Sequence, residues 1–142
     1  MNIAKIMIPK ASTALLLSTN SVRQGLEKMR RHGYTALPVV DEHGAYCGCV
    51  NEGDFLRHIL ATGTLDMKAQ EQYQVRDIIR EAFCPPLRIM ASEEEVLALA
   101  LKQNFVPIVD DRNCFCGIVT RQGVIGYLAE QLAQLRQTEP AT

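Results

Sequence analysis

Pro38-Val39-Val40-Asp41 decides the fold of this chain, because the sequence contains it a second time as Pro107-Ile108-Val109-Asp110, with one substitution. The two stretches lie about 70 residues apart, and the alignment continues without a gap to Gly48 and Gly117. Self-similarity at a fixed spacing is the signature of repeated structural units. Two copies of this length are too few and too long for a solenoid, so the sequence predicts a tandem duplication.

Each copy has the pattern of a strand, a helix, two strands and a second helix. Short apolar runs at 15–17 and 87–90 predict the first strands. Asn20 or Ser21 and, in the second copy, Ser92 are good N-caps for the helices that follow. The predicted fold class is therefore α+β (mixed α/β), with two β-α-β-β-α motifs, each preceded by a short helix, packed as a pseudo-twofold pair.

Both copies place a hairpin turn at the same position. The turns fall at 41–44 and 110–113, and the residues that close them are Gly44 and Asn113. Gly and Asn are the residues that best tolerate a positive φ, so two different sequences meet one backbone requirement.

The duplication also sets the predicted boundaries. These are a first motif at 1–62, a linker at 63–74, a second motif at 75–132 and a tail at 133–142. The linker is polar and compatible with a short helix, the last helix is expected to end near Leu132, and the tail is expected to fray after Arg136.

Composition excludes several classes of protein. Hydrophobic residues make up 47% of the chain and the formal charge is −1, so we expect no nucleic-acid or membrane partner. No apolar run approaches the roughly 20 residues that cross a bilayer, and residues 1–10 lack a signal-peptide pattern. Five cysteines are an odd number and do not resemble a secreted disulfide framework, so a cytoplasmic location is expected.

The repeated motifs resemble those of the CBS family, named after cystathionine β-synthase. The motifs are Met7-Ile8-Pro9, Gly33-Tyr34-Thr35-Ala36-Leu37-Pro38-Val39-Val40-Asp41, Gly48-Cys49-Val50-Asn51-Glu52-Gly53-Asp54, Pro107-Ile108-Val109-Asp110 and Gly117-Ile118-Val119-Thr120-Arg121. The resemblance implies a Bateman module, which binds AMP, ATP, S-adenosylmethionine or cyclic di-AMP in a cleft between the copies. More narrowly, the chain is similar to the small stand-alone cyclic-di-AMP-binding CBS proteins of bacteria.

The family's ribose-phosphate pattern runs from a glycine through a Thr or Ser to an Asp. In the first copy the resemblance places it on Gly48, Asn51 and Asp54, with Asn in place of Thr or Ser. A polar cap and the free N–H groups of a first helical turn suit a phosphate. An ionised Asp can accept hydrogen bonds from both hydroxyls of a ribose, so this site suits a nucleoside monophosphate.

The second copy departs from the pattern, because Gly123 stands three residues after Thr120, where the Asp is expected. A cyclic dinucleotide has an esterified 3′ hydroxyl and makes less use of that Asp. Arg121 is a bidentate phosphate binder, so this site fits a cyclic dinucleotide at least as well.

By resemblance, the wall facing these helix starts is lined by Tyr34, Thr35, Ala36 and Pro38. A simpler interpretation remains open for several site residues. Helix capping alone explains Asn51 and Thr120, Arg121 can be a solvated charge, and Tyr34 can be plain packing.

The remaining residue patterns in the sequence do not indicate catalysis. Cys47 with Cys49 and Cys114 with Cys116 each share a strand face, but their equivalents in the other copy include apolar residues. Buried small hydrophobic residues therefore explain them better than a zinc site. The sequence has no phosphate-binding Gly-rich loop and no nucleophile–base pattern, so we expect a non-enzyme without metal or cofactor.

The function predicted is that of a regulatory sensor, which binds an adenine nucleotide between its two motifs and signals to an unidentified partner protein. A homodimer is expected by resemblance, with contacts from the apolar helix at 96–101, Phe55, Leu128 and Leu132. The alternative is a dimerisation or scaffold module that works without nucleotide, because both copies depart from the family pattern.

Overall fold

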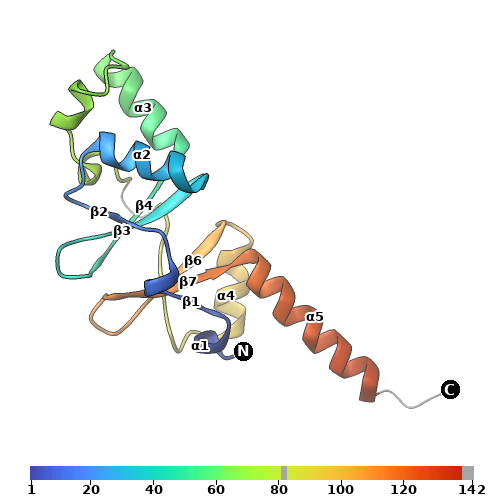
Figure 1. Ribbon diagram of the computed structural model, residues 1–142. Coiled ribbons are helices and arrows are strands. Elements are labelled where there is room, and N and C mark those ends of the chain that lie inside the picture. Colours follow the sequence, from blue (N-terminus) through green and yellow to red (C-terminus); the bar gives the residue numbers. More distant parts are fainter. Residues whose placement is uncertain (81–82, 139–142) are drawn as a thin grey trace.

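A computed structural model describes residues 1–80 and 83–138 and shows two motifs next to each other (Figure 1). The first motif contains β2 (Leu16–Leu17), α2 (Val22–His32), β3 (Ala36–Val40), β4 (Tyr46–Asn51) and α3 (Glu52–Thr62). The second contains β5 (Leu87–Arg88), α4 (Glu93–Ala100), β6 (Phe105–Val109), β7 (Phe115–Thr120) and α5 (Arg121–Thr138). The remaining elements are α1 (Ile3–Ile6), β1 (Ile8–Pro9) and the 3-10 turns η1 (Lys10–Ser12), η2 (Ala69–Gln72) and η3 (Val75–Asp77).

Each motif forms its own small sheet. The first has the order β2-β3-β4, with a parallel pair followed by an antiparallel hairpin. The second repeats this as β5-β6-β7 and adds β1 on the outer edge of β7. The central strands β3 and β6 are almost entirely buried, as their continuous apolar runs require. The predicted α+β fold class is confirmed.

The two motifs are related by a local twofold axis that passes between their hairpins. The Tyr46 N–H donates to the Asn113 carbonyl, and the equivalent Phe115 N–H donates to the Gly44 carbonyl, both at 2.9 Å. The bridge between Ala45 and its repeat equivalent Cys114 lies on this axis. The predicted pseudo-twofold pair is therefore held by two equivalent main-chain hydrogen bonds.

The segments that precede the two motifs exchange places. Ile3 of α1 comes before the first motif, yet it is buried in the core of the second with Val96 and Val106. Val75 of η3 precedes the second motif, yet it is buried in the core of the first with Phe55. Neither core is complete without the leading segment of the other copy, so the halves form one cooperative unit.

Gly117 permits this exchange at one point of close approach. Pro9 of β1 pairs with Gly117 in the middle of β7. A Cβ atom at position 117 would overlap the carbonyl oxygen of Ile8 and crowd the side chain of Met7. A residue without a side chain is needed here because another backbone crosses the strand.

Local predictions of caps and turns agree with the structure. Ser21 and Ser92 form capping boxes at the starts of α2 and α4, and Asn51 forms one at the start of α3. Gly44 and Asn113 both adopt a positive φ, at 84° and 65°. These features depend on neighbouring residues alone, which is why the sequence predicts them.

Longer-range expectations were less accurate. α5 continues to Thr138, well beyond the expected end near Leu132, and residues 139–142 of the expected tail lie outside the described part. Phe55 and Val96 were expected to contact a second copy, but each fills the core of its own motif. That expectation is wrong for both, whereas Leu128 and Leu132 do lie exposed on α5.

Candidate functional site

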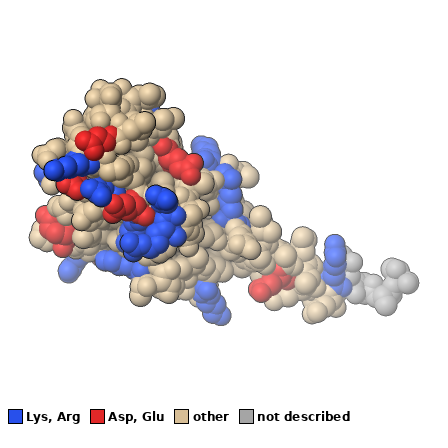
Figure 2. Space-filling model, turned by 45° about the horizontal axis from the view of Figure 1, so that its top comes forward, with Lys and Arg blue, Asp and Glu red and all other residues tan. Residues whose placement is uncertain are grey.

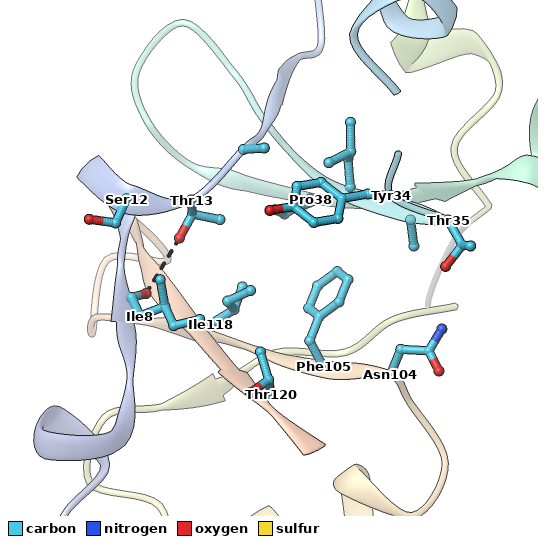
Figure 3. A pocket seen from close by; sticks show the side chains of 13 residues that line it. Ile8, Ser12, Thr13, Tyr34, Thr35, Pro38, Asn104, Phe105, Ile118 and Thr120 are labelled. Carbon is cyan, nitrogen blue, oxygen red and sulfur yellow. Dashed lines mark hydrogen bonds between the residues drawn. The ribbon is translucent and has the colours of Figure 1, made fainter. Parts of the chain in front are cut away.

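The larger of the two crevices that the local twofold axis relates is a cavity of about 250 Å³ (Figure 3). Its lining comes from three parts of the chain: the segment after α1, the start of β3, and the edges of β6 and β7. The lining residues are Ile8, Ser12, Thr13, Ala14, Tyr34, Thr35, Ala36, Leu37, Pro38, Asn104, Phe105, Ile118 and Thr120. Five of the eight predicted site residues, namely Tyr34, Thr35, Ala36, Pro38 and Thr120, are therefore brought together here.

The two sides of this cavity carry aromatic rings. Figure 3 shows Tyr34 of the first motif and Phe105 of the second facing the same space. The Tyr34 side chain is 52% exposed, and its ring stacks parallel to that of His32 at 5.8 Å. An exposed ring beside an apolar crevice offers a flat surface to a planar ligand such as a purine.

Hydroxyl groups and a helix start provide the polar part of the lining. Thr120 precedes α5, and its Oγ1 accepts the Gly123 N–H at 3.0 Å. Thr13 donates its hydroxyl to the Pro9 carbonyl at 2.9 Å, which holds the opposite rim. The first turn of an 18-residue helix beside hydroxyl groups suits an anionic group. This lining can accommodate a phosphate without a charged side chain.

The local twofold axis generates a second, smaller cavity of about 140 Å³. Its lining residues are Ala36, Cys49, Asn51, Phe83, Cys84, Lys102, Gln103, Asn104 and Phe105. Asn51 occupies the position equivalent to Thr120, so each of the two crevices has one of these two helix-cap residues in its lining. The two crevices are equivalent in topology but differ in side chains.

Asp54 is not among the residues that line the second cavity, although it is hydrogen-bonded to Asn51, which is. Its Oδ2 accepts the Asn51 N–H at 2.8 Å, and the Asn51 side chain accepts the Asp54 N–H at 2.9 Å. The other oxygen, Oδ1, forms ion pairs with Arg57 and Arg80, the latter at 2.7 Å. The carboxylate is buried and fully engaged, so capping and ion pairing describe its contacts in this structure.

Arg121 lines neither of these two crevices. Its guanidinium donates to the carbonyls of Ala100 at 2.8 Å and Leu101 at 3.4 Å, at the end of α4. These carbonyls lack helical partners, and a cation satisfies them and complements the helix dipole. Phosphate binding by Arg121 stays a prediction, and it would require this side chain to leave α4.

Several lining residues were not among the sequence predictions. Asn104 and Phe105 follow directly from the duplication, because they are the repeat equivalents of Thr35 and Ala36. Ser12 and Thr13 had no such signal. They reach the cavity because the segment after α1 crosses to the second motif, which the repeat alone does not reveal.

The cysteines do not form a metal site in the described residues, where no group of three or more potential ligands occurs. All five are free thiols, and Cys47 is exposed, contrary to the expectation of buried cysteines. Cys49 and Cys84 are largely buried, and both belong to the lining of the second cavity. A hydrogen bond between their thiols lowers the pKa of Cys84 and raises that of Cys49.

The surface carries charges of both signs. Figure 2 shows Lys and Arg interspersed with Asp and Glu on one face, in keeping with the net charge of −1. None of the helices in the described part of the chain has an apolar stretch long enough for a membrane span.

Duplicated motifs, exchanged leading segments and crevices on a local twofold axis define a CBS pair. The CBS domain profile matches residues 5–61 and 75–130, and the chain belongs to this family.

Individual relatives include cyclic-di-AMP-binding proteins. Cyclic di-AMP receptor B of Bacillus subtilis (strain 168) is 22% identical over 135 residues, which are 95% of this chain and 91% of the receptor. The crystal structure of CbpB with c-di-AMP matches at a TM-score of 0.87 and 18% identity, covering 98% of this chain and 91% of that one. CBSX2 in complex with AMP matches at a TM-score of 0.73 and 23% identity, covering 91% and 96%. The chain is thus a CBS pair that resembles regulatory modules which bind cyclic di-AMP or AMP.

Proposed function

We propose that this protein is a regulatory sensor that binds an adenine nucleotide in the larger cavity, with cyclic di-AMP as the preferred ligand. The observation that carries the proposal is the open crevice between Tyr34 and Phe105, with the start of α5 at its floor. The aromatic and apolar walls suit adenine, and the hydroxyls and helix start suit a phosphate. Binding would thus depend on residues from both motifs.

The choice of a cyclic dinucleotide follows from the residue at position 123, which is a glycine. Gly123 replaces the Asp that would accept two ribose hydroxyls, and no carboxylate occurs among the described residues that line this cavity. Replacing that Asp by Gly removes hydrogen bonds to ribose hydroxyls. A ligand whose 3′ hydroxyl is esterified therefore loses less binding free energy than AMP does. The similarity to a cyclic di-AMP receptor along most of both chains supports the same choice.

The output of such a sensor would be a surface that a regulated protein recognises. A ligand shifts a conformational equilibrium only by binding one state better than the other. The larger cavity contains residues of both motifs and of the segment after α1, so its occupant can favour one arrangement of these parts.

We also propose a homodimer that forms through the α4 and α5 side of the second motif. Leu97 of α4 and Leu101, which directly follows α4, line an apolar groove with Ile125 and Leu128 of α5. Beyond the groove the apolar row continues on α5 at Leu132. A row at this spacing suits packing against an identical helix of a second copy.

A scaffold that functions without nucleotide is the second candidate. Its support is the second crevice, where Asp54 is engaged by Arg57 and Arg80 and the space is only about 140 Å³. If both crevices behaved in this way, the chain would retain the CBS fold and its dimer but bind no nucleotide.

Thermal unfolding with cyclic di-AMP, AMP, ATP and S-adenosylmethionine separates the two candidates. A ligand at 100 times its Kd adds about 2.7 kcal/mol to the free energy of unfolding and raises the midpoint by several degrees. The sensor is supported if cyclic di-AMP produces the largest shift, and the scaffold if none of the four produces one.

Two variants at equivalent positions provide the control. Thr120→Val removes a hydroxyl from the larger cavity, and Asn51→Val removes the equivalent cap from the smaller one. Both lose a helix cap and about 1 kcal/mol of stability. Only Thr120→Val is expected to weaken cyclic di-AMP binding, by roughly tenfold, because only that side chain faces the proposed ligand.

A further inference from the structure

We propose that Cys49 and Cys84 form a redox-sensitive pair, which hydrogen peroxide oxidises to a disulfide that distorts the wall of the larger cavity. Oxidation would then weaken the binding of cyclic di-AMP. The disulfide is inferred from the side chains around the second cavity alone. Its effect on the ligand rests on the proposed nucleotide function and adds a form of regulation to it.

The two cysteines come from distant parts of the chain and meet in one cluster. Cys49 lies on β4 of the first motif, and Cys84 lies in the segment that leads to β5 of the second. Their side chains belong to one small buried cluster with Phe105, and the two thiols are hydrogen-bonded to each other. A disulfide can form only between side chains that already approach each other, and this pair meets that requirement.

Both thiols are also within reach of a small oxidant. The two residues are only 4% and 7% exposed, yet both line the second cavity of about 140 Å³. The hydrogen bond from Cys49 lowers the pKa of Cys84, and Gln103 Nε2 donates to the Cys84 Sγ at 3.5 Å. The thiolate is the form that attacks an oxidant, so Cys84 is the expected nucleophile and Cys49 the thiol that completes the disulfide.

Oxidation by hydrogen peroxide takes two steps. The Cys84 thiolate attacks one peroxide oxygen, the O–O bond breaks, and hydroxide leaves and takes up the proton that the Cys84 thiol had lost. The Cys49 sulfur then attacks the sulfur of the Cys84 sulfenic acid, the S–O bond breaks, and the oxygen leaves as water with the Cys49 proton. Two thiols and one peroxide thus give one disulfide and two waters, and the two electrons pass to the peroxide.

The cluster that contains the pair also separates the two cavities. Phe105 belongs to this cluster and lines both cavities, and so does Ala36, which packs against it. An S–S bond is much shorter than a hydrogen bond between two thiols, and close-packed interiors transmit such a shift to their neighbours. Oxidation should therefore displace the Phe105 ring, which faces the proposed ligand in the larger cavity (Figure 3).

The fold does not require thiols at these two positions. Ile118 is the repeat equivalent of Cys49, and Thr13 precedes β2 by three residues as Cys84 precedes β5. Both equivalents line the larger cavity, with one apolar and one hydroxyl side chain. Substitution of either cysteine should therefore leave the protein folded.

Peptide mapping by mass spectrometry tests the disulfide without any nucleotide. After treatment with hydrogen peroxide and alkylation of the remaining thiols, trypsin should release peptide 32–57 linked to peptide 81–88. Cys49→Ala and Cys84→Ala should each abolish the link. Cys47→Ala, the matched control in the same tryptic peptide, should keep it. Absence of the link in wild-type protein, or its persistence in Cys49→Ala, would overturn the inference.

Calorimetry with cyclic di-AMP measures the effect on the ligand. The disulfide-linked protein is expected to bind about tenfold more weakly than the reduced protein, within the usual range of coupling between two sites, and dithiothreitol should restore the affinity. Cys49→Ser/Cys84→Ser should bind equally well before and after peroxide treatment. Equal affinity of the reduced and disulfide-linked wild-type protein, or the same loss in the double variant, would refute the regulation.

The two readouts also separate this inference from the proposed function. A reduced protein that binds no cyclic di-AMP but forms the link would refute the sensor, and with it the effect on the ligand, while supporting the disulfide. A reduced protein that binds cyclic di-AMP but forms no link would support the sensor and refute the redox pair.

Discussion

The ring of Tyr46 in the first motif stacks on the ring of Phe115 in the second, with 6.1 Å between the centroids and 22° between the planes. These two residues are repeat equivalents, and with Val40 and Val109 they form the apolar cluster that joins the halves. The contact lies beside the local twofold axis, next to the two reciprocal main-chain hydrogen bonds. The crevices on either side depend on this junction for their shape.

Phe115→Ala should lower the free energy of unfolding by about 3–5 kcal/mol, because it leaves a hole at the junction of the motifs. Tyr46→Phe is the matched control: it keeps the ring and removes only the hydroxyl that donates to the Cys84 carbonyl at 2.6 Å. That change should cost about 1 kcal/mol. Urea unfolding measures both, and equal effects would show that ring packing does not join the halves.

Gly117→Ala should destabilise the protein by about 3 kcal/mol, because the new Cβ atom would collide with the backbone of β1. Hydrogen exchange in residues 1–12 should increase as β1 detaches. Gly126→Ala, in open space on α5, should instead stabilise by about 0.5–1 kcal/mol through helix propensity. A neutral result for Gly117→Ala would contradict the close crossing of the exchanged segment.

Tyr34→Ala should weaken cyclic di-AMP binding by about tenfold, in line with the roughly 1–3 kcal/mol that a base gains from stacking on an aromatic side chain. Stability should hardly change, because half of the Tyr34 side chain is exposed. Tyr34→Phe should retain affinity for cyclic di-AMP, because it keeps the ring. Tyr73→Ala should also retain it, because Tyr73 packs against His58 and does not line the larger cavity. Equal affinity for Tyr34→Ala and wild type would place the adenine elsewhere.

Leu132→Asp should convert the proposed dimer to a monomer, because it puts a charge into the apolar row on α5. Light scattering coupled to size-exclusion chromatography gives the mass directly. Leu65→Asp, at a residue that is 78% exposed outside α4 and α5, should leave the dimer intact. A wild-type chain that is monomeric at micromolar concentration would contradict the dimer.

The duplication predicts those parts of the molecule that depend on short-range requirements. Gly44 and Asn113 both take the positive φ that their shared turn demands, and Ser92 caps the helix that it precedes. Tyr34 and Thr120 could be assigned to one crevice from the family pattern, and both line the larger cavity.

What the sequence could not predict depends on contacts between distant segments. The crossing of β1 to β7 is invisible to a pattern that treats each copy alone, so Ser12 and Thr13 were missed. Arg80 lies in a segment without periodicity, and its pairing with Asp54 depends on tertiary packing. Arg121 has the residue type of a phosphate ligand, but unpaired carbonyls at the end of α4 compete for it.

The central claim is that the larger cavity is a nucleotide site, and titration of wild-type protein with cyclic di-AMP in a calorimeter tests it most directly. The account predicts saturable binding with one ligand per chain, tighter than that of AMP and weakened by Thr120→Val but not by Asn51→Val. An absence of saturable binding for both nucleotides up to millimolar concentration would contradict it.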